Sequence, residues 1–290
     1  MLLYRGLTEE GHLRRHTDLD AKRVSEQECI ASALAIERVF LVEDMDKVKR
    51  VAETDRLRSA LLTSISHDLK TPLSSILGSA TTMRDLSGRL QEAEKSELLT
   101  TVIDESERLN RFIANLLDMT RLESGAIAPN FALYDLREIV DTALKRAAKI
   151  LSNHKIEIEL ASDLPMTNVD AVLLEQALFN LLDNAAKYAP SDTVVRIDAE
   201  LDGSDVVLRI MDEGDGVPPA DTAAIFDKFY RAQKGDQIQP GTGLGLAIAR
   251  GFIESMKGSI VAGNRPDRSG ALFTIKFRAQ KGNLTLDSTS

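Results

Sequence analysis

The chain has 290 residues, which is enough for about two domains of ordinary size. It carries 36 basic against 45 acidic residues, and this net charge of −9 argues against general binding to nucleic acid. Cys29 is the only cysteine, and no stretch approaches the ~18 apolar residues of a membrane span. The composition therefore predicts a soluble chain in a reducing, cytoplasmic setting.

Residues 21–85 are predicted to form one or two long helices. Apolar side chains recur every four positions, the spacing of one continuous helical face, at Leu57, Leu61, Ile65 and Leu69. The stretch SISHDLKTPL (64–73) interrupts this face with a titratable His67, followed by Asp68 and Thr71-Pro72. Proline removes a backbone donor, so a helix that serves only for packing would not carry this combination.

A turn is expected near Gly88, and a second helix from about residue 92 to 122. Its apolar residues alternate in steps of three and four, as in a bundle seam, at Leu98, Val102, Leu109, Phe112, Leu116 and Met119. Two antiparallel helices cannot bury both of their apolar faces alone. We therefore expect the hairpin to pair with a second copy of itself as a four-helix bundle. The alternative is packing against the rest of the same chain.

Residues 123–130 are expected to form a linker, after which the pattern changes to mixed α and β. Helices are predicted over 135–150 and 170–188. The predicted strands are 156–160, 193–201, 205–211, 258–263 and 271–278. Two of them flank an Asp-Gly turn and are expected to form a hairpin. The economical fold is an α+β sandwich, a sheet with helices on a single face.

Polar side chains in the predicted helix FNLLDNAAKY (179–188) share one face, because Asn180, Asn184 and Lys187 fall at i, i+4 and i+7. Asparagine oxygens suit Mg²⁺, and a lysine beside them neutralises phosphate. Exposed asparagine and lysine are also the ordinary solvated face of a helix, so this pattern is weak on its own.

Two glycine-rich stretches follow. In MDEGDG (211–216), Asp212 can accept hydrogen bonds from an amino group such as that of adenine, although a tight turn would look the same. In GTGLGLAIAR (241–250), three glycines lead into a helix whose first N–H groups can bind phosphate. This loop fits neither the P-loop nor the Rossmann spacing. The polar segment 225–241 between them is long enough to be a functional lid or disordered.

These elements in this order resemble the histidine-kinase and GHKL ATPase superfamily. SISHDLKTPL resembles its H box, FNLLDNAAKY its N box, DEGDG its G1 box, FDKFYR its F box and GTGLGLA its G2 box. The resemblance implies a GHKL-type (Bergerat) ATP-binding domain, with ATP and Mg²⁺ as cofactors, Mg²⁺ on Asn180 and Asn184, and Asp212 on adenine. The further nucleotide contacts that it implies are Lys187, Tyr188, Gly214, Gly216, Phe226, Arg231, Gly241, Thr242, Gly243, Leu244 and Gly245.

His67 lies two residues from Ile65 and from Leu69, about 160° around the helix from each, so its imidazole points away from the seam. A lone helical histidine is normally a surface residue, but beside an ATP site it becomes a candidate nucleophile, with Asp68 as the base. Pro72 would let the helix bend. The resemblance implies transfer of the phosphoryl group to a response-regulator receiver domain docked near residues 71–75, and a role for Thr71 in dephosphorylating that regulator.

The predicted organisation has four parts. Residues 1–49 form an N-terminal segment and signalling helix, 50–124 the dimerisation and histidine phosphotransfer domain, 125–280 the catalytic ATP-binding domain, and 281–290 a flexible tail. ALAIERVFLVEDMDK and the H-box region are similar to the cytoplasmic end of KdpD-type sensor kinases, and the upstream helix resembles the end of their GAF-like module. Those proteins carry membrane spans, so this chain is expected to be the cytoplasmic part of an inner-membrane sensor or a shortened gene product.

One departure from the family pattern is Met256-Lys257-Gly258, where a His-Gly-Gly or Met-Gly-Gly turn is common. Gly258 is expected to supply the left-handed helix cap.

Two rival functions stay open at this point. One is an ATPase of the same fold without kinase activity, such as a chaperone or repair clamp, and the other is a degenerate kinase kept for dimerisation and docking. His12 and His16 are spaced like a metal pair, but with no third ligand nearby in sequence they are interpreted as surface residues.

Overall fold

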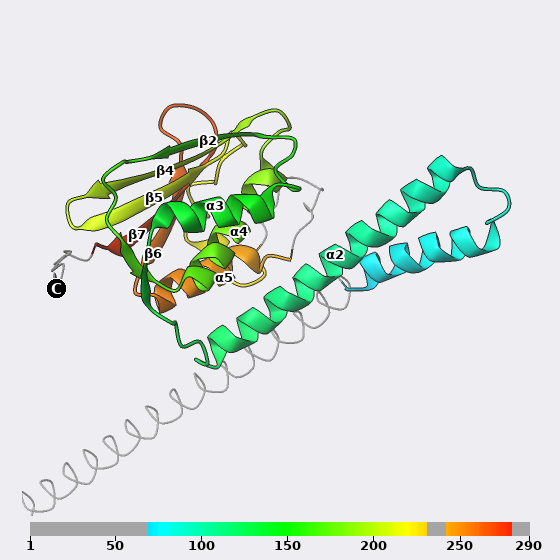
Figure 1. Ribbon diagram of the computed structural model, residues 1–290, viewed down its shortest axis with the longest axis horizontal. Helices are drawn as coiled ribbons and strands as arrows, with labels where there is room; N and C mark the ends of the chain where they lie inside the picture. The colour runs from blue at the N-terminus through cyan, green and yellow to red at the C-terminus, as the bar shows by residue number, and fades with distance from the viewer. Residues whose placement is uncertain (1–68, 231–241, 280–290) are drawn as a thin grey trace, which may run out of the picture. The chain divides into compact units, whose positions relative to one another are not determined.

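The computed structural model describes residues 69–230 and 242–279. The chain there begins with a helix over residues 69–85, which continues through Pro72 and is followed by a turn. The next helix, α2 (Glu92–Glu123), runs back alongside it to complete the expected helical hairpin (Figure 1). The backbone N–H of Gln91 donates to Glu94 Oε2 at 2.7 Å, which satisfies one of the free donors at the start of α2.

The apolar residues of α2 divide into two sets. Those of the predicted seam are buried or half-buried, and Phe112 and Met119 are the most enclosed. A second set, not predicted, is about half exposed and comprises Leu99, Ile103, Ile113 and Leu117. At 100° per residue these four fall within about 40° of one line along the helix. One apolar face of α2 is therefore covered and another is left open. At the C-terminal end of the covered face, Met119 packs into the core of the α+β domain.

The α+β domain is built on a five-stranded sheet with the order β2-β4-β5-β7-β6. Its strands are β2 (Lys155–Leu160), β4 (Val194–Asp202), β5 (Asp205–Met211), β6 (Ser259–Asn264) and β7 (Ala271–Arg278). β2 pairs with β4 in parallel, and the other neighbours are antiparallel. The predicted hairpin is confirmed, since β4 and β5 join through a turn in which Gly203 has φ 61°.

Three helices cover one face of this sheet, which confirms the predicted layers (Figure 1). They are α3 (Leu136–Ala147), α4 (Ala171–Tyr188) and α5 (Gly245–Ser255). On β7 the alternate residues Phe273, Ile275 and Phe277 are buried beneath them. The alternate apolar residues of the strands and the apolar faces of the helices thus form one core.

Three short elements were not predicted. β1 (Ala132–Tyr134) pairs with β3 (Thr167–Val169) as a separate two-stranded sheet, and η1 (Ala224–Phe226) is a single 3-10 turn. Each has only three residues, which is too short for a recurring apolar pattern to be visible in the sequence. All three lie in stretches to which the sequence analysis assigned no helix or strand.

The cap at the end of α5 corrects one expectation. The residue in the left-handed conformation is Lys257, with φ 62°, and not Gly258. The N–H of Lys257 donates to the carbonyl of Glu254, and that of Gly258 to the carbonyl of Ile253, both at 2.9 Å, which is the Schellman arrangement. Gly258 is needed for space, because a β-carbon there would stand 2.5 Å from the Phe277 ring.

Several predictions concern residues outside the described ranges. They include the segments 1–49 and 281–290, the H-box residues His67 and Asp68, the histidines His12 and His16, and the lid residues Arg231 and Gly241. Within residues 69–230 and 242–279, no helix is both long enough and apolar enough to cross a bilayer.

Candidate nucleotide-binding site

Helix α4 carries the N-box side chains into the domain. Its first turn is capped by Asp170, whose Oδ1 accepts from the N–H groups of Val172 and Leu173 at 3.0 and 3.1 Å. Asn180 is only 6% exposed, and its Nδ2 is buried without a hydrogen-bond partner in the structure. Buried polar groups are rarely left unpaired, so this amide is an expected contact for a polar ligand or an ordered water.

A cleft lies beside this face of α4. Seven of the predicted site residues line it, namely Asn180, Asn184, Lys187, Tyr188, Thr242, Gly243 and Gly245. Its volume is about 80 Å³, below the roughly 300–1,000 Å³ of typical ligand pockets. We therefore expect the surrounding elements to separate when a nucleotide enters.

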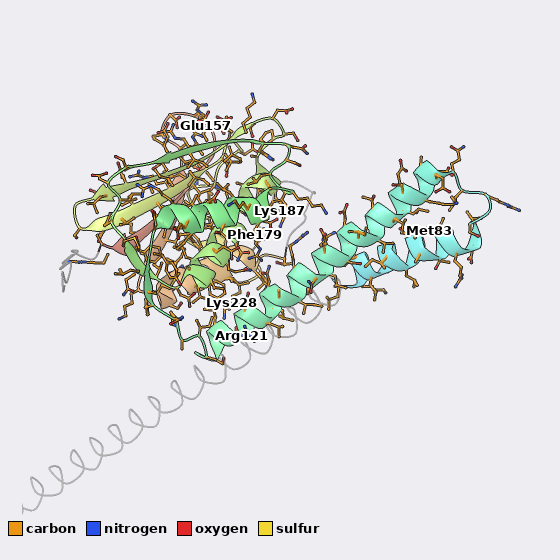
Figure 2. All side chains as sticks on the ribbon, in the orientation of Figure 1. Met83, Arg121, Glu157, Phe179, Lys187 and Lys228 are labelled. Atoms are coloured by element: carbon orange, nitrogen blue, oxygen red, sulfur yellow. The ribbon has the colours of Figure 1, made fainter. Side chains whose placement is uncertain are left out.

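The cleft also contains residues that the sequence did not single out. Asp183 and Tyr230 line it, as does Asn115 of α2. Lys187 lies in the last turn of α4 (Figure 2). Its Nζ forms an ion pair with the Asp183 carboxylate one turn earlier. The ion pair carries no net charge, so a phosphate group would have to compete with Asp183 for the ammonium group of Lys187.

Asp212 follows β5 and is 2% exposed. Its Oδ1 accepts the backbone N–H groups of Gly214 and Ala271 at 2.8 and 3.0 Å, and these bonds fix the plane of the carboxylate. Burial raises the pKa of this carboxyl, and the two backbone bonds counteract part of the shift. A buried acceptor held by the backbone is suited to recognise a donor such as an exocyclic amino group.

The glycines after Asp212 are required for close packing. A β-carbon at Gly214 would stand 2.7 Å from the Tyr188 carbonyl oxygen, which belongs to the end of α4. Gly216 has φ 79°, and a β-carbon there would stand 2.5 Å from Asn264 Oδ1. The G1 turn therefore touches both the N box and the end of β6, and larger residues do not fit there.

The G2 loop enters α5 through Gly243, which has φ 66° and lies against the backbone of Phe229. The Phe229 N–H donates to the Gly243 carbonyl at 2.9 Å. Among the residues that the structure describes, no side chain caps α5, so the first-turn N–H groups around Gly245 and Leu246 are open to a ligand at the cleft. Leu244 was expected to contact the cofactor, but its side chain is fully buried in the core and anchors the loop.

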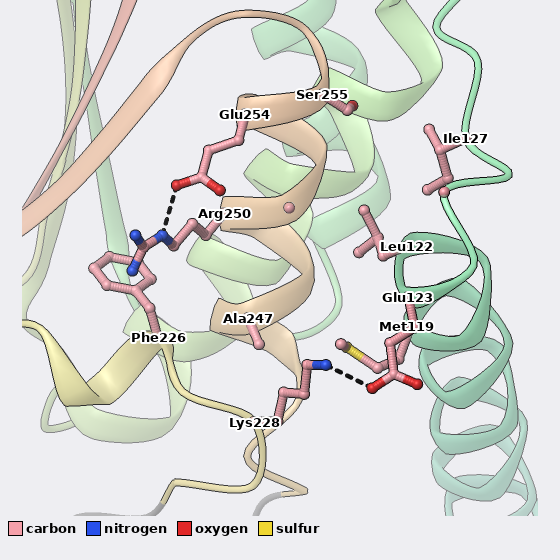
Figure 3. Close-up of a pocket in the computed structure, with 12 residues that line it drawn as sticks. Met119, Leu122, Glu123, Ile127, Phe226, Lys228, Ala247, Arg250, Glu254 and Ser255 are labelled. Atoms are coloured by element: carbon pink, nitrogen blue, oxygen red, sulfur yellow. Dashed lines mark hydrogen bonds and ion pairs between the residues drawn. The ribbon is translucent and has the colours of Figure 1, made fainter. Parts of the chain in front are cut away.

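Phe226 also differs from the expectation. Its ring packs edge-on against Phe273 with centroids 6.4 Å apart, and the Arg250 guanidinium lies 5.7 Å above it. It lines a separate groove of about 410 Å³ beside α5, where Lys228 Nζ bonds to Glu123 Oε1 at 2.5 Å (Figure 3). Phe226 is therefore a buried residue at the base of the F box, and its contact with a nucleotide stays a prediction.

The donor set at the cleft fits a hard cation bound together with phosphate. The amides of Asn180 and Asn184 supply neutral oxygen ligands of the kind Mg²⁺ accepts when phosphate oxygens and water complete its shell. Across the described parts of the chain, no three His, Cys, Asp or Glu residues gather into a metal site of their own. A magnesium ion here would therefore depend on the nucleotide.

Comparison with known proteins identifies both halves of the chain. Residues 57–125 match the His Kinase A (phospho-acceptor) domain. Residues 169–281 match the histidine kinase-, DNA gyrase B- and HSP90-like ATPase family. The chain belongs to the histidine kinases. Apart from Asn115, the residues that line the cleft described above lie within the stretch matched to the ATPase family.

The expected likeness to KdpD-type sensor kinases is confirmed. The chain is 38% identical over 250 residues to sensor protein KdpD of Clostridium acetobutylicum, an alignment that covers 86% of this chain and 27% of that protein. The identity to sensor protein KdpD of Escherichia coli is 36% over 277 residues, with coverage of 94% and 30%. The chain thus spans less than a third of the length of these relatives.

A solved structure has a similar fold. Full-length ShkA, crystallised in complex with AMPPNP, superposes with a TM-score of 0.54 at 27% identity, covering 77% of this chain and 46% of ShkA.

Proposed function

We propose that this chain is the core of an ATP-dependent protein-histidine kinase that phosphorylates its own His67. The observation that carries the proposal is the convergence of the N-box amides, the G2 glycines and the open N-terminus of α5 on one cleft, with the buried carboxylate of Asp212 nearby. The AMPPNP complex of ShkA supports assigning the nucleotide as adenine-based and carrying a triphosphate.

Each part of the cleft has a role in this proposal. Asp212 accepts a hydrogen bond from the adenine amino group, and Asn180 and Asn184 hold Mg²⁺. The N–H groups at the start of α5 bind the phosphates, and Lys187 and Arg231 neutralise them. Bound ATP would supply the transferable γ-phosphoryl group. The protein contributes mainly orientation and charge neutralisation, as is general for phosphoryl transfer.

The acceptor is proposed from the sequence. A neutral imidazole nitrogen of His67 attacks the γ-phosphorus, the bond from phosphorus to the bridging oxygen breaks, and ADP leaves. Asp68 holds or accepts the proton on the other imidazole nitrogen. The same phosphoryl group then passes to an aspartate of a response-regulator receiver domain docked near residues 71–75. In a separate hydrolytic reaction Thr71, which is exposed on the first helix, helps a water molecule to release the phosphoryl group of that regulator as inorganic phosphate.

A homodimer is part of the proposal. The open face of α2 exposes between 45% and 54% of Leu99, Ile103, Ile113 and Leu117. Leu73 and Leu77, one turn apart on the first helix, are 57% and 66% exposed. A row of large exposed aliphatic residues on both helices is what a four-helix bundle of two hairpins would cover. We also propose that this core acts on the cytoplasmic side of a membrane, the setting expected from its resemblance to KdpD-type sensor kinases.

The two rival functions make different predictions. An ATPase without kinase activity would hydrolyse ATP but leave no label on histidine, and a degenerate kinase would bind nucleotide without turnover. Incubation of the purified chain with γ-labelled ATP and Mg²⁺ tests all three. Label that is lost in acid but stable in base supports the kinase. Acid-stable label or none would overturn it, and the His67→Gln variant is the control for the site.

A further inference from the structure

A buried arginine lies behind the G1 turn. Arg265 begins the turn between β6 and β7, and its side chain is only 4% exposed. Charged side chains are almost never buried to this degree without partners. No feature of the sequence distinguished Arg265 from the exposed arginines nearby.

The partners of Arg265 are well defined. Its Nε donates to Asp267 Oδ1 at 3.1 Å and its Nη2 to Asp267 Oδ2 at 2.8 Å, a two-point pairing of guanidinium and carboxylate. Its Nη1 lies 3.4 Å from the backbone carbonyl oxygen of Asp212, to which it donates, and 3.9 Å from Glu213 Oε1. One planar group therefore connects Asp267 with the backbone of Asp212.

Asp267 is suited to hold the arginine in this position. The Asp267 side chain is half exposed, so its charge remains hydrated while it neutralises the buried guanidinium of Arg265. The hydrogen bonds from Arg265 hold the pKa of Asp267 well below its usual range, so the pair stays ionised at any pH where the protein would work. This spares Arg265 the cost of an uncompensated buried charge.

The rest of the β6–β7 turn holds the same stretch of backbone. Ser269 Oγ donates to the Gly214 carbonyl at 2.7 Å. Gly270, at φ 143°, lies so close to Asp212 that a β-carbon would stand 1.9 Å from its carbonyl oxygen. The same β-carbon would stand 3.0 Å from Arg265 Cδ. The arginine, the glycine and the Asp212 carbonyl therefore pack as one unit, and the carboxylate orientation depends on it.

We propose that Arg265, held by Asp267, is a positioning residue that keeps the Asp212 carboxylate aimed at the base of the bound nucleotide. This inference rests on the proposed function, since it assumes that Asp212 recognises the adenine amino group. Arg265 touches no nucleotide itself. Its effect reaches the ligand through the backbone of Asp212, and should therefore appear in base discrimination more than in phosphate binding.

The test compares two nucleotides, ATP and purine riboside triphosphate, which lacks the 6-amino group. The parent protein should bind ATP about tenfold or more tightly than the analogue, because the buried carboxylate loses its partner with the analogue. In Arg265→Met this ratio should fall toward one while the affinity for the analogue changes little. Arg265→Lys, which keeps the charge but not the fork, should lie between the two. Arg278→Met, an exposed arginine on β7, is the matched control.

Binding is measured by calorimetry with the whole chain, and folding by thermal unfolding. If Arg265→Met does not fold, Asp267→Asn and Arg265→Lys decide the question by the same ratio. A merely structural role would weaken both nucleotides equally, and an unchanged ratio in a folded variant overturns the inference. Failure of the parent to bind ATP at all would instead refute the proposed function.

Discussion

The carbonyl oxygen of Tyr188 lies against the α-carbon of Gly214, so that a β-carbon at position 214 would stand 2.7 Å from it. Tyr188 ends α4 and Gly214 belongs to the turn after β5, so this contact sets the spacing between the N box and the G1 turn. The two Tyr188 atoms that such a β-carbon would approach, the carbonyl oxygen and the carbonyl carbon, belong to the backbone. Backbone atoms cannot move aside as the end of a flexible side chain can. The geometry of the nucleotide site thus depends on a residue without a side chain.

Gly214→Ala should therefore weaken ATP binding and reduce the free energy of unfolding by about 1–3 kcal/mol, the usual cost of forcing extra volume into a packed site. The matched control is Gly263→Ala on β6, where an added β-carbon meets nothing within 4 Å. Calorimetric affinity and thermal denaturation measure the two effects. Equal behaviour of the two variants would mean that the contact is not a constraint.

Asn184→Ala should remove the Mg²⁺-dependent part of ATP binding, roughly 10–100-fold in affinity, and leave dimerisation intact. The physical reason is the loss of one of the two neutral oxygen ligands on the cleft face of α4. ATP titrations with Mg²⁺ and with EDTA separate this effect from general damage. Asn153→Ala is the control, because that asparagine is exposed and accepts the Asp192 N–H through its backbone carbonyl. A variant that keeps the full Mg²⁺ dependence would exclude Asn184 as a ligand.

Substitutions at the adjacent residues Lys257 and Gly258 should change the free energy of unfolding in opposite directions. A residue with a side chain pays about 1–2 kcal/mol to adopt the left-handed conformation, and Lys257→Gly relieves this cost. The substitution also loses the cation–π contact between Lys257 and the Phe131 ring, 5.9 Å away, which is worth about 0.5–1 kcal/mol. The protein should gain about 0.5 kcal/mol. Gly258→Ala should lose about 1–3 kcal/mol, since the added carbon meets the Phe277 ring. Denaturant titration measures both, and a stabilised Gly258→Ala variant would contradict the assignment of the cap.

The end of α5 illustrates what the sequence could and could not predict. Apolar periodicity located the long helices and the sheet strands, and the order of the boxes identified the site. Which residue of Lys257-Gly258 takes the left-handed cap depends on the Phe277 ring packed behind it, which is not local information. Motif membership likewise does not show which residues of a box face a ligand and which anchor the motif, and it did not predict that the side chains of Phe226 and Leu244 are buried in the core.

Arg265 was missed for a related reason. A single arginine in a turn belongs to no recurring sequence pattern. Its burial arises only when the β6–β7 hairpin pairs with β5 in the sheet. The open face of α2 was missed because its residues fall between the seam positions. Only the structure shows that these aliphatic side chains are exposed while those of the seam are covered.

Thr71→Ala should keep autophosphorylation and forward transfer but lose most regulator dephosphorylation. A hydroxyl one turn after His67 can hold a water beside an aspartyl phosphate, whereas Asp68 already serves the forward reaction. The regulator is phosphorylated chemically, and its decay is followed with ADP and either parent or variant. Thr71→Ser should retain the activity, and Ser87→Ala, an exposed hydroxyl in the following turn, should be neutral. Equal decay with parent and Thr71→Ala would remove Thr71 from the phosphatase reaction.

The buried Asp212 should make base recognition sensitive to acid. Its pKa is raised, chiefly by burial, so it becomes protonated at a higher pH than an ordinary carboxyl. Arg265 and His154 are the positive or titratable groups that favour its charged form. Preference for ATP over purine riboside triphosphate should therefore be full near neutral pH and decline on acidification before an exposed carboxylate would titrate. Protonation of the triphosphate affects both nucleotides alike, so it does not change the ratio of their affinities.

The same shift has a consequence for stability, with a defined sign. A carboxyl whose pKa is higher in the folded than in the unfolded state binds more protons when folded, so its contribution to stability falls as pH rises through that range. At neutral pH the free protein thus carries the cost of a buried charge. Asp212→Asn keeps an oxygen for the Gly214 and Ala271 N–H groups and should raise the melting temperature near neutral pH. It should lose the preference for ATP at every pH, because an amide nitrogen then faces the adenine amino group. A variant that keeps a preference which declines on acidification would show that another group titrates.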